Sequence, residues 1–109
     1  MQFVVLATDK AGCLELRERT RPEHRIHLRT GPAHAVKVVL AGPTFEASGV
    51  YMNGTMLVVE AESIEAVARF VAVDPYSIAG LFERVDIRPW SCGLGRIESS
   101  VPDPMTAQR

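Results

Sequence analysis

Four strand-like segments, separated by two helix-like segments, constrain this chain more than any other feature of its sequence. Short runs of β-branched and aliphatic residues predict strands at 3–6, 35–43 and 55–61. A polar, glycine-containing stretch between the second and third runs predicts a loop or hairpin. The last predicted strand, 84–88, alternates apolar with charged residues and stops at Pro89.

The first helix-like segment contains a proline that predicts a break. Pro22 has no backbone N–H to donate and would interrupt a helix interior. Thr20 and Glu23 stand at capping-box spacing, in which the hydroxyl and the carboxylate each accept from a backbone N–H group. We therefore expect a short turn followed by a helix from about Arg21 to about Gly31.

The second helix-like segment has a start signal and one apolar face. Ser63 is a good N-cap, and Glu65 suits the positive end of the helix dipole. The apolar positions recur at the spacing of one buried helix face, and they are Ile64, Val67, Ala68 and Val71. This segment predicts a helix over 64–71.

The order strand, helix, strand, strand, helix, strand predicts one domain over residues 1–90. A compact chain satisfies it most simply as a ferredoxin-like α+β fold, an antiparallel sheet with both helices on one face. Because three strands are apolar at consecutive positions, the other face also needs cover, and we expect a homodimer. Residues 91–109 lose all periodicity and are predicted to be a C-terminal tail, ordered only if something else holds it.

Composition excludes several classes of protein. With 12 basic and 13 acidic residues in 109, the net charge is −1, so the basic footprint of a nucleic-acid binder is missing. The longest N-terminal apolar run, Phe3 to Ala7, is too short for a signal sequence or a membrane span. Two widely separated cysteines, Cys13 and Cys92, are typical of reduced thiols. We expect a soluble, cytoplasmic protein.

His24 and Asp74 are the residues most suited to chemistry. The predicted fold lets the start of one helix approach the end of the other, and a carboxylate beside an imidazole orients the ring for proton transfer. Each residue also has a plain structural interpretation: Asp74 can cap a helix with Pro75 at its first position, and His24 can be solvated. Tyr76 is either a donor to a ligand or an amphipathic core residue.

Cations gather near the predicted position of His24. Lys10, Arg17 and Arg21 surround the end of the first strand and the entry to the first helix. Together they would bind a small organic anion, since Arg holds a carboxylate through two parallel bonds. Alternatively they form a solvated face and pair with the interleaved acids Glu15, Glu18 and Glu23.

No metal site or cofactor is implied by the sequence. His27 lies three residues after His24, but no third ligand stands at a fitting spacing. Cys13 has no paired base in the sequence and is interpreted as a small apolar residue rather than a nucleophile. His34 lies by a loop and carries no signal.

Two motifs give the chain a resemblance to a known family. The segments "TDKAGCLELRERTRPEH" and "VDPYSIAGLFERVDIRPW", with "AGP" and "VVEAES" between them, resemble the YCII-related (YciI-like) domain family over residues 1 to about 90. The chain departs from the family pattern in "RIHLRTGPAHAVK", where the helix usually continues with apolar residues. The resemblance implies a dimeric α+β barrel and puts His24 of R-P-x-H and Asp74 of D-P-Y in the active site. It also implies proton transfer on small oxygenated rings, as in a relative described as a dehydrochlorinase and in muconolactone isomerase of the wider superfamily.

Two functional hypotheses follow from these features. The first is a cofactor-independent lyase or isomerase acting on a small anionic cyclic or aromatic metabolite. In it His24 moves a proton, Asp74 orients the ring, the cations hold the anion and Tyr76 lines the pocket. The second is a non-catalytic dimeric module that binds a small ligand or serves as a scaffold, in which the His–Asp pair docks two helices.

Overall fold

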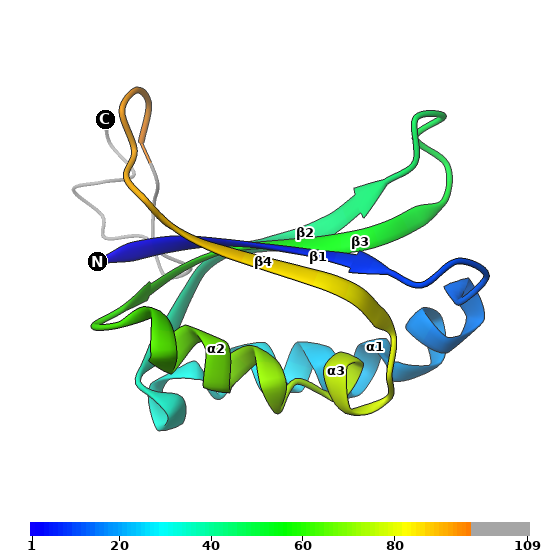
Figure 1. Ribbon diagram of the computed structural model, residues 1–109, viewed down its shortest axis with the longest axis horizontal. Coiled ribbons are helices and arrows are strands. Elements are labelled where there is room, and N and C mark those ends of the chain that lie inside the picture. Colours follow the sequence, from blue (N-terminus) through cyan, green and yellow to red (C-terminus); the bar gives the residue numbers. More distant parts are fainter. Residues whose placement is uncertain (97–109) are drawn as a thin grey trace, which may run out of the picture.

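The four strands and the two longer helices follow one another along the chain in the predicted order, strand, helix, strand, strand, helix, strand (Figure 1). The structure is a computed structural model and describes residues 1–96. Its elements are β1 (Gln2–Asp9), α1 (Leu14–Arg29), the short 3₁₀ helix η1 (Gly31–His34), β2 (Val36–Phe45), β3 (Met52–Ala61), α2 (Ile64–Ala72), α3 (Pro75–Ile78) and β4 (Phe82–Trp90). The predicted tail is described only as far as residue 96, and its remainder lies outside the described residues.

The four strands form one antiparallel sheet in the order β2-β3-β1-β4. All three helices lie on the same face of this sheet (Figure 1). This arrangement is the ferredoxin-like α+β fold, and it confirms the predicted fold class.

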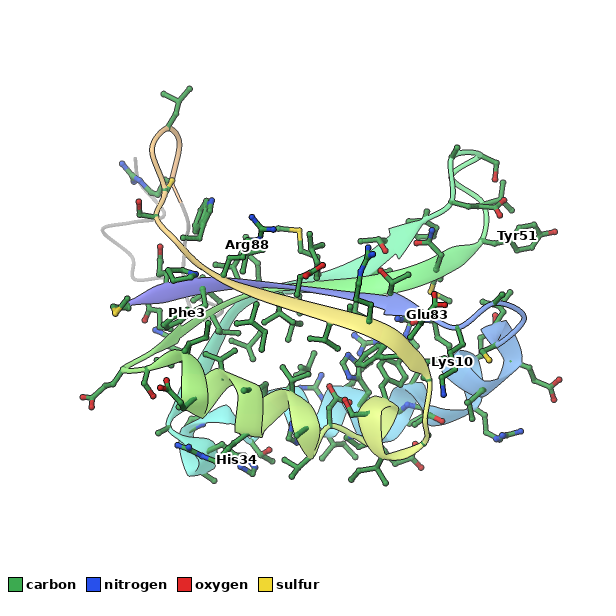
Figure 2. All side chains as sticks on the ribbon, in the orientation of Figure 1. Phe3, Lys10, His34, Tyr51, Glu83 and Arg88 are labelled. Carbon is green, nitrogen blue, oxygen red and sulfur yellow. The ribbon has the colours of Figure 1, made fainter. Side chains whose placement is uncertain are left out.

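The hydrophobic core lies between the sheet and α2. Phe3 of β1 pairs with Val59 of β3, both are buried, and Phe3 points toward the helices while Arg88 lies on the opposite face (Figure 2). Helix α2 begins at the predicted cap, where the Ser63 side chain accepts a hydrogen bond from the backbone N–H of Ala66. Its buried face differs in part from the prediction: Ile64 and Ala68 are exposed, and Ala66, Val67, Phe70 and Val71 face the core.

The predicted break at Pro22 is wrong, because α1 runs without interruption from Leu14 to Arg29. Thr20 and Glu23 lie inside this helix and form no cap, and Cys13 takes the N-cap position. Pro22 removes one helical hydrogen bond, to the carbonyl of Glu18. Both residues lie on the exposed side of α1, where water can satisfy that carbonyl.

Two strands are longer than predicted because their prolines lie at sheet edges. Strand β2 continues beyond Pro43 to Phe45, and β4 continues through Pro89 to Trp90. Each is an outer strand, so one side of its backbone needs no partner and a missing N–H is tolerated. With β3 beginning at Met52, the predicted connection of residues 44–54 shrinks to a short turn.

The sheet face away from the helices has an apolar, partly open region over β1, β2 and β3, beside the charged residues of β4. Leu6 and Met56 form a cross-strand pair on this face, and Leu40 lies on the adjoining strand. These three side chains are 45%, 41% and 49% exposed. We call Leu6, Leu40 and Met56 the outer apolar face. No helix of the described residues is long and apolar enough to cross a membrane.

Replacing Pro22 should stabilise the protein. In Pro22→Ala the helical hydrogen bond to Glu18 can form, and the ring no longer crowds that carbonyl. Proline in a helix interior costs about 3 kcal/mol relative to alanine. Removing it also makes the unfolded chain more flexible, which lowers the stability of the variant by about 1 kcal/mol. We expect the free energy of unfolding, measured in urea, to rise by about 1–2 kcal/mol.

Pro75 provides the matched control, since it occupies the first turn of α3, where no backbone donor is needed. Pro75→Ala should leave stability unchanged or lower it slightly. A loss of stability in Pro22→Ala would show that the proline fits α1 better than this geometry implies.

Candidate functional site

The fold brings His24 and Asp74 together although they are 50 residues apart in sequence. His24 lies on the buried side of α1, and Asp74 is the residue immediately before α3. His24 Nδ1 is 2.9 Å from Oδ1 and 2.8 Å from Oδ2 of Asp74, and both residues are at least nine-tenths buried. Because a carboxylate only accepts, Nδ1 carries the shared proton. Nε2 is then the nitrogen left to exchange a proton with a ligand.

Asp74 is a helix cap as well as the partner of His24. Its Oδ1 accepts from the backbone N–H of Tyr76 at 2.8 Å, and Pro75 occupies the first position of α3, as the structural interpretation of the sequence expected. The two roles are compatible, because a carboxylate has enough lone pairs for both donors. The cap therefore fixes the carboxylate that orients the imidazole.

Tyr76 packs directly on the imidazole. The two rings stack with centroids 3.9 Å apart and an angle of 16° between their planes. Burial raises the pKa of the Tyr76 phenol above its ordinary value of 10.0, against the opposing effect of the Arg17 and Arg21 charges. The phenol therefore stays protonated at neutral pH and can serve as a hydrogen-bond donor.

Arg17 is the most constrained cation of the site. It is 3% exposed, and its Nε and Nη2 donate to the two carboxylate oxygens of Asp9 at 2.6 and 3.1 Å. Nη2 also donates to Thr55 Oγ1 at 2.6 Å, and the guanidinium carbon lies 4.7 Å from the centre of the Tyr76 ring. These bonds leave the two N–H groups of Nη1 for a ligand. A fixed arginine of this kind can hold an anionic oxygen with little loss of side-chain entropy on binding.

A cavity of about 590 Å³ adjoins these residues. One wall is the inner side of α1 with His24, and the opposite wall is formed by β2 residues such as Val38 and Ala41; Thr55 and Tyr76 lie beside them. Among the described residues every charged residue of its lining is a cation: Arg17, Arg21, Arg25, Arg29 and Lys37. The size fits a small organic molecule, and the charge favours an anion.

The structure assembles most of the predicted site but leaves Lys10 out. Arg17, Arg21, His24 and Tyr76 line the cavity, and Asp74 supports it from behind His24. Lys10 is exposed in the connection after β1 (Figure 2), and its backbone N–H donates to the carbonyl of residue 81. Its Nζ lies beside Gly80 in the turn after α3, and Lys10 is not among the residues that line the cavity.

His27 has a structural contact of its own. Its Nε2 donates to the backbone carbonyl of Phe70 at 2.8 Å, and its ring stacks on that phenylalanine with centroids 4.3 Å apart. It thus connects α1 to α2, away from His24. Within residues 1–96 no group of three His, Cys, Asp or Glu side chains could hold a metal ion. Cys13 is half-buried, and both it and Cys92 are free.

Sequence reasoning missed four residues that shape the site. Asp9 and Thr55 fix Arg17, but each stands in or next to a strand, where nothing local indicates a partner on α1. Arg25 and Arg29 did leave a signal, because they continue Arg17 and Arg21 at every fourth position, which is one face of a helix. The expected break at Pro22 concealed that periodicity.

Comparisons of the chain with a family model, with curated proteins and with solved structures all find YciI-like relatives. The model of the YCII-related domain family matches residues 1–91. Protein YciI of Escherichia coli O6:H1 is 32% identical over 95 residues, which cover 83% of this chain and 96% of that protein. Among solved structures, 5-chloro-2-hydroxyhydroquinone dehydrochlorinase from Burkholderia phenoliruptrix AC1100, in complex with 2,5-dihydroxybenzoquinone, has 32% identity and a TM-score of 0.73 over 85% of this chain and 96% of its own. Protein Atu4242 from Agrobacterium tumefaciens, 16% identical with a TM-score of 0.50 over 81% of this chain and 89% of its own, shares the fold.

The double role of Asp74 predicts an unusually costly substitution. Asp74→Ala removes a helix cap and also leaves a buried imidazole without its partner. We expect a loss of about 3 kcal/mol in the free energy of unfolding, the sum of a cap and a charged hydrogen bond.

Ser63→Ala is the matched control, because Ser63 caps α2 and has no second partner of this kind. It should cost about 1 kcal/mol. Equal costs of Asp74→Ala and Ser63→Ala in urea unfolding would mean that the His24 contact contributes nothing to stability.

Proposed function

The chain belongs to the YCII-related domain family, and from this premise we propose that it is a small enzyme of the lyase or isomerase type. It moves a proton on a small anionic cyclic or aromatic metabolite. The observation that carries the proposal is the buried His24–Asp74 pair, whose imidazole borders a cationic cavity. In this proposal the side chains of the protein carry out the proton transfer without a cofactor.

His24 acts as the proton carrier in this proposal. With Nδ1 donating to Asp74, the neutral ring presents a lone pair on Nε2 and takes a proton from a carbon or hydroxyl group of the bound ring. The imidazolium that forms is stabilised by the adjacent carboxylate. The proton then returns to another atom in an isomerisation. In an elimination, the electron pair left on the ring instead expels an anion such as chloride.

The cations stabilise the negative charge that develops. Removing a proton next to a ring carbonyl places charge on oxygen, and Arg17 offers its free Nη1 donors from a fixed position. Arg21, four residues further along α1, lines the same cavity. The Tyr76 phenol, which is protonated at neutral pH, is a third donor; burial raises its pKa further. Arg17 and Tyr76 are 3% and 1% exposed, so charge–dipole interactions with their donors are screened less than in bulk water.

One structural neighbour supports the choice of substrate. The dehydrochlorinase from Burkholderia phenoliruptrix is named for a chlorinated hydroxyhydroquinone and was solved with a dihydroxybenzoquinone. Its 32% identity over most of both chains makes an oxygenated six-membered ring a reasonable substrate class for this chain as well. Quinone-like oxygens would accept hydrogen bonds from the arginines described above.

Loss of either member of the pair should abolish turnover. On a substrate found by screening small cyclic acids, we expect His24→Ala and Asp74→Asn each to lower kcat/KM by about a hundredfold or more, the typical contribution of a general acid or base. Arg19→Gln is the control, since Arg19 lies on α1 but does not line the cavity. Full turnover in both site variants would refute the mechanism.

The same variants test the rival function, a non-catalytic binding module. The pair is buried and joins α1 to α3, so a purely docking role is physically possible. In that case His24→Ala would lower the melting temperature by several degrees and have no other effect. A loss of turnover in a variant that stays folded favours a functional site, whatever the change in its melting temperature.

We also propose that the protein is a homodimer. The outer apolar face leaves Leu6, Leu40 and Met56 between 41% and 49% exposed, and a second copy placed sheet against sheet would bury them. Light scattering at micromolar concentration should give twice the mass of one chain. Leu6→Glu should yield monomers, whereas Leu94→Glu, at a residue 97% exposed, should not. A wild-type mass of one chain would refute the dimer.

A cytoplasmic location is proposed from the cysteines. Cys13 and Cys92 are both free, and Cys92 is exposed. Unpaired exposed thiols are typical of a reducing compartment.

A further inference from the structure

Helix α1 carries a row of arginines along the cavity beyond His24. Arg25 and Arg29 continue the four-residue spacing of Arg21, and all three line the cavity. Residues at this spacing stand one above another on the same helix face. The row therefore runs along the cavity past His24, with Arg21 before it and Arg25 and Arg29 after it.

These arginines have no acidic partner in the described part of the chain. Arg17 is paired with Asp9, and Arg84 with Asp86, but within residues 1–96 no carboxylate oxygen lies within 4.0 Å of Arg21, Arg25 or Arg29. Lys37 of β2 also lines the cavity, and it stands directly opposite Glu60 in the sheet register. Three of the lining cations without an ion pair in the described residues therefore lie on α1.

The row is unfavourable in the absence of a ligand. Like charges four residues apart on a helix repel each other, and Arg21, Arg25 and Arg29 form two such pairs in succession. An anion bound between them would replace repulsion by attraction. The arrangement is therefore that expected of a site completed by a negatively charged group.

Apolar residues separate the two ends of the cavity. Leu28 of α1 and Val38 and Ala41 of β2 belong to its lining. Since an α-helix rises about 1.5 Å per residue, Arg29 lies about 8 Å along the axis from His24. A ligand that spans this distance needs a reactive part at His24, an apolar middle and a charged group at the far end.

We infer that the substrate of this site carries an acidic group, a carboxylate or a phosphate, remote from the reacting atoms and bound by Arg25 and Arg29. This inference rests on the proposed function and narrows its substrate class to ring compounds with a distal acid. Arg25 and Arg29 are specificity residues in this inference, because they bind the distal acid, whereas Arg17 and Tyr76 lie next to the reacting end at His24.

Binding measurements with three probes test the inference. The probes are benzoate, terephthalate and para-carboxyphenyl phosphate, which share one ring and differ in the second acidic group. Calorimetric or NMR titration of the wild type should show at least one of the two diacids binding about tenfold more tightly than benzoate. The tighter of the two identifies the distal group as carboxylate or phosphate.

Two double variants locate the effect. Arg25→Gln with Arg29→Gln should reduce diacid affinity about tenfold and leave benzoate affinity within about twofold. Arg19→Gln with Arg69→Gln removes the same charge from residues outside the cavity lining and should keep the diacid preference. Thermal unfolding without ligand should show the first double variant to be at least as stable as the wild type, because helix repulsion is relieved.

Two results would overturn the inference. One is that neither diacid binds more tightly than benzoate, which includes the case in which no probe binds. The other is that the two double variants weaken diacid binding equally, which would mean general electrostatic attraction. His24→Ala should retain diacid affinity, so a failure of the proton-transfer mechanism and a failure of this inference are distinguishable.

Discussion

The carboxylate of Asp74 is the contact on which the candidate site depends. It accepts the backbone N–H that begins α3 and also the Nδ1 proton of His24 on α1. Because α3 places Tyr76 against the imidazole, one side chain determines the position of both rings. The two interpretations of Asp74 suggested by the sequence, helix cap and site residue, are therefore two uses of the same group, and the cap supplies the rigidity that proton transfer requires.

A second buried charge extends this rigid region to the sheet. Asp9 at the end of β1 and Thr55 of β3 hold Arg17, whose guanidinium lies over Tyr76. The half of the cavity near His24 is thus built from buried, mutually bonded groups. The other arginines of the lining, Arg21, Arg25 and Arg29, are exposed and have no acidic partner among the described residues. Buried, fixed groups thus surround the proposed site of proton transfer, and exposed arginines that can adapt are available to bind the rest of the substrate.

Pro22 shows how a sound local rule gave a wrong expectation. Proline lowers helix stability, but here its missing bond faces solvent while His24 and His27, in the following turns, hold α1 against α3 and α2. The stabilisation from these tertiary contacts thus exceeds the cost of one residue that disfavours the helix. The error also affected the prediction of the site. Because the helix was expected to begin near Arg21, the arginines at every fourth position from Arg17 to Arg29 were not recognised as one helix face. Pro43 and Pro89 misled in the same way, since local sequence does not reveal which strands are edges.

Apolar periodicity and capping residues were sufficient to predict the order of strands and helices and the ferredoxin-like fold, because these are local properties and few compact topologies satisfy them. The motifs around His24 and Asp74 were visible for the same reason. Only the tertiary structure decided three features of the site. It gave Arg17 its partners, left Lys10 outside the cavity lining, and placed His27 against Phe70. Each depends on which face of an element meets another element, and that is determined by the packing of the whole chain around one core.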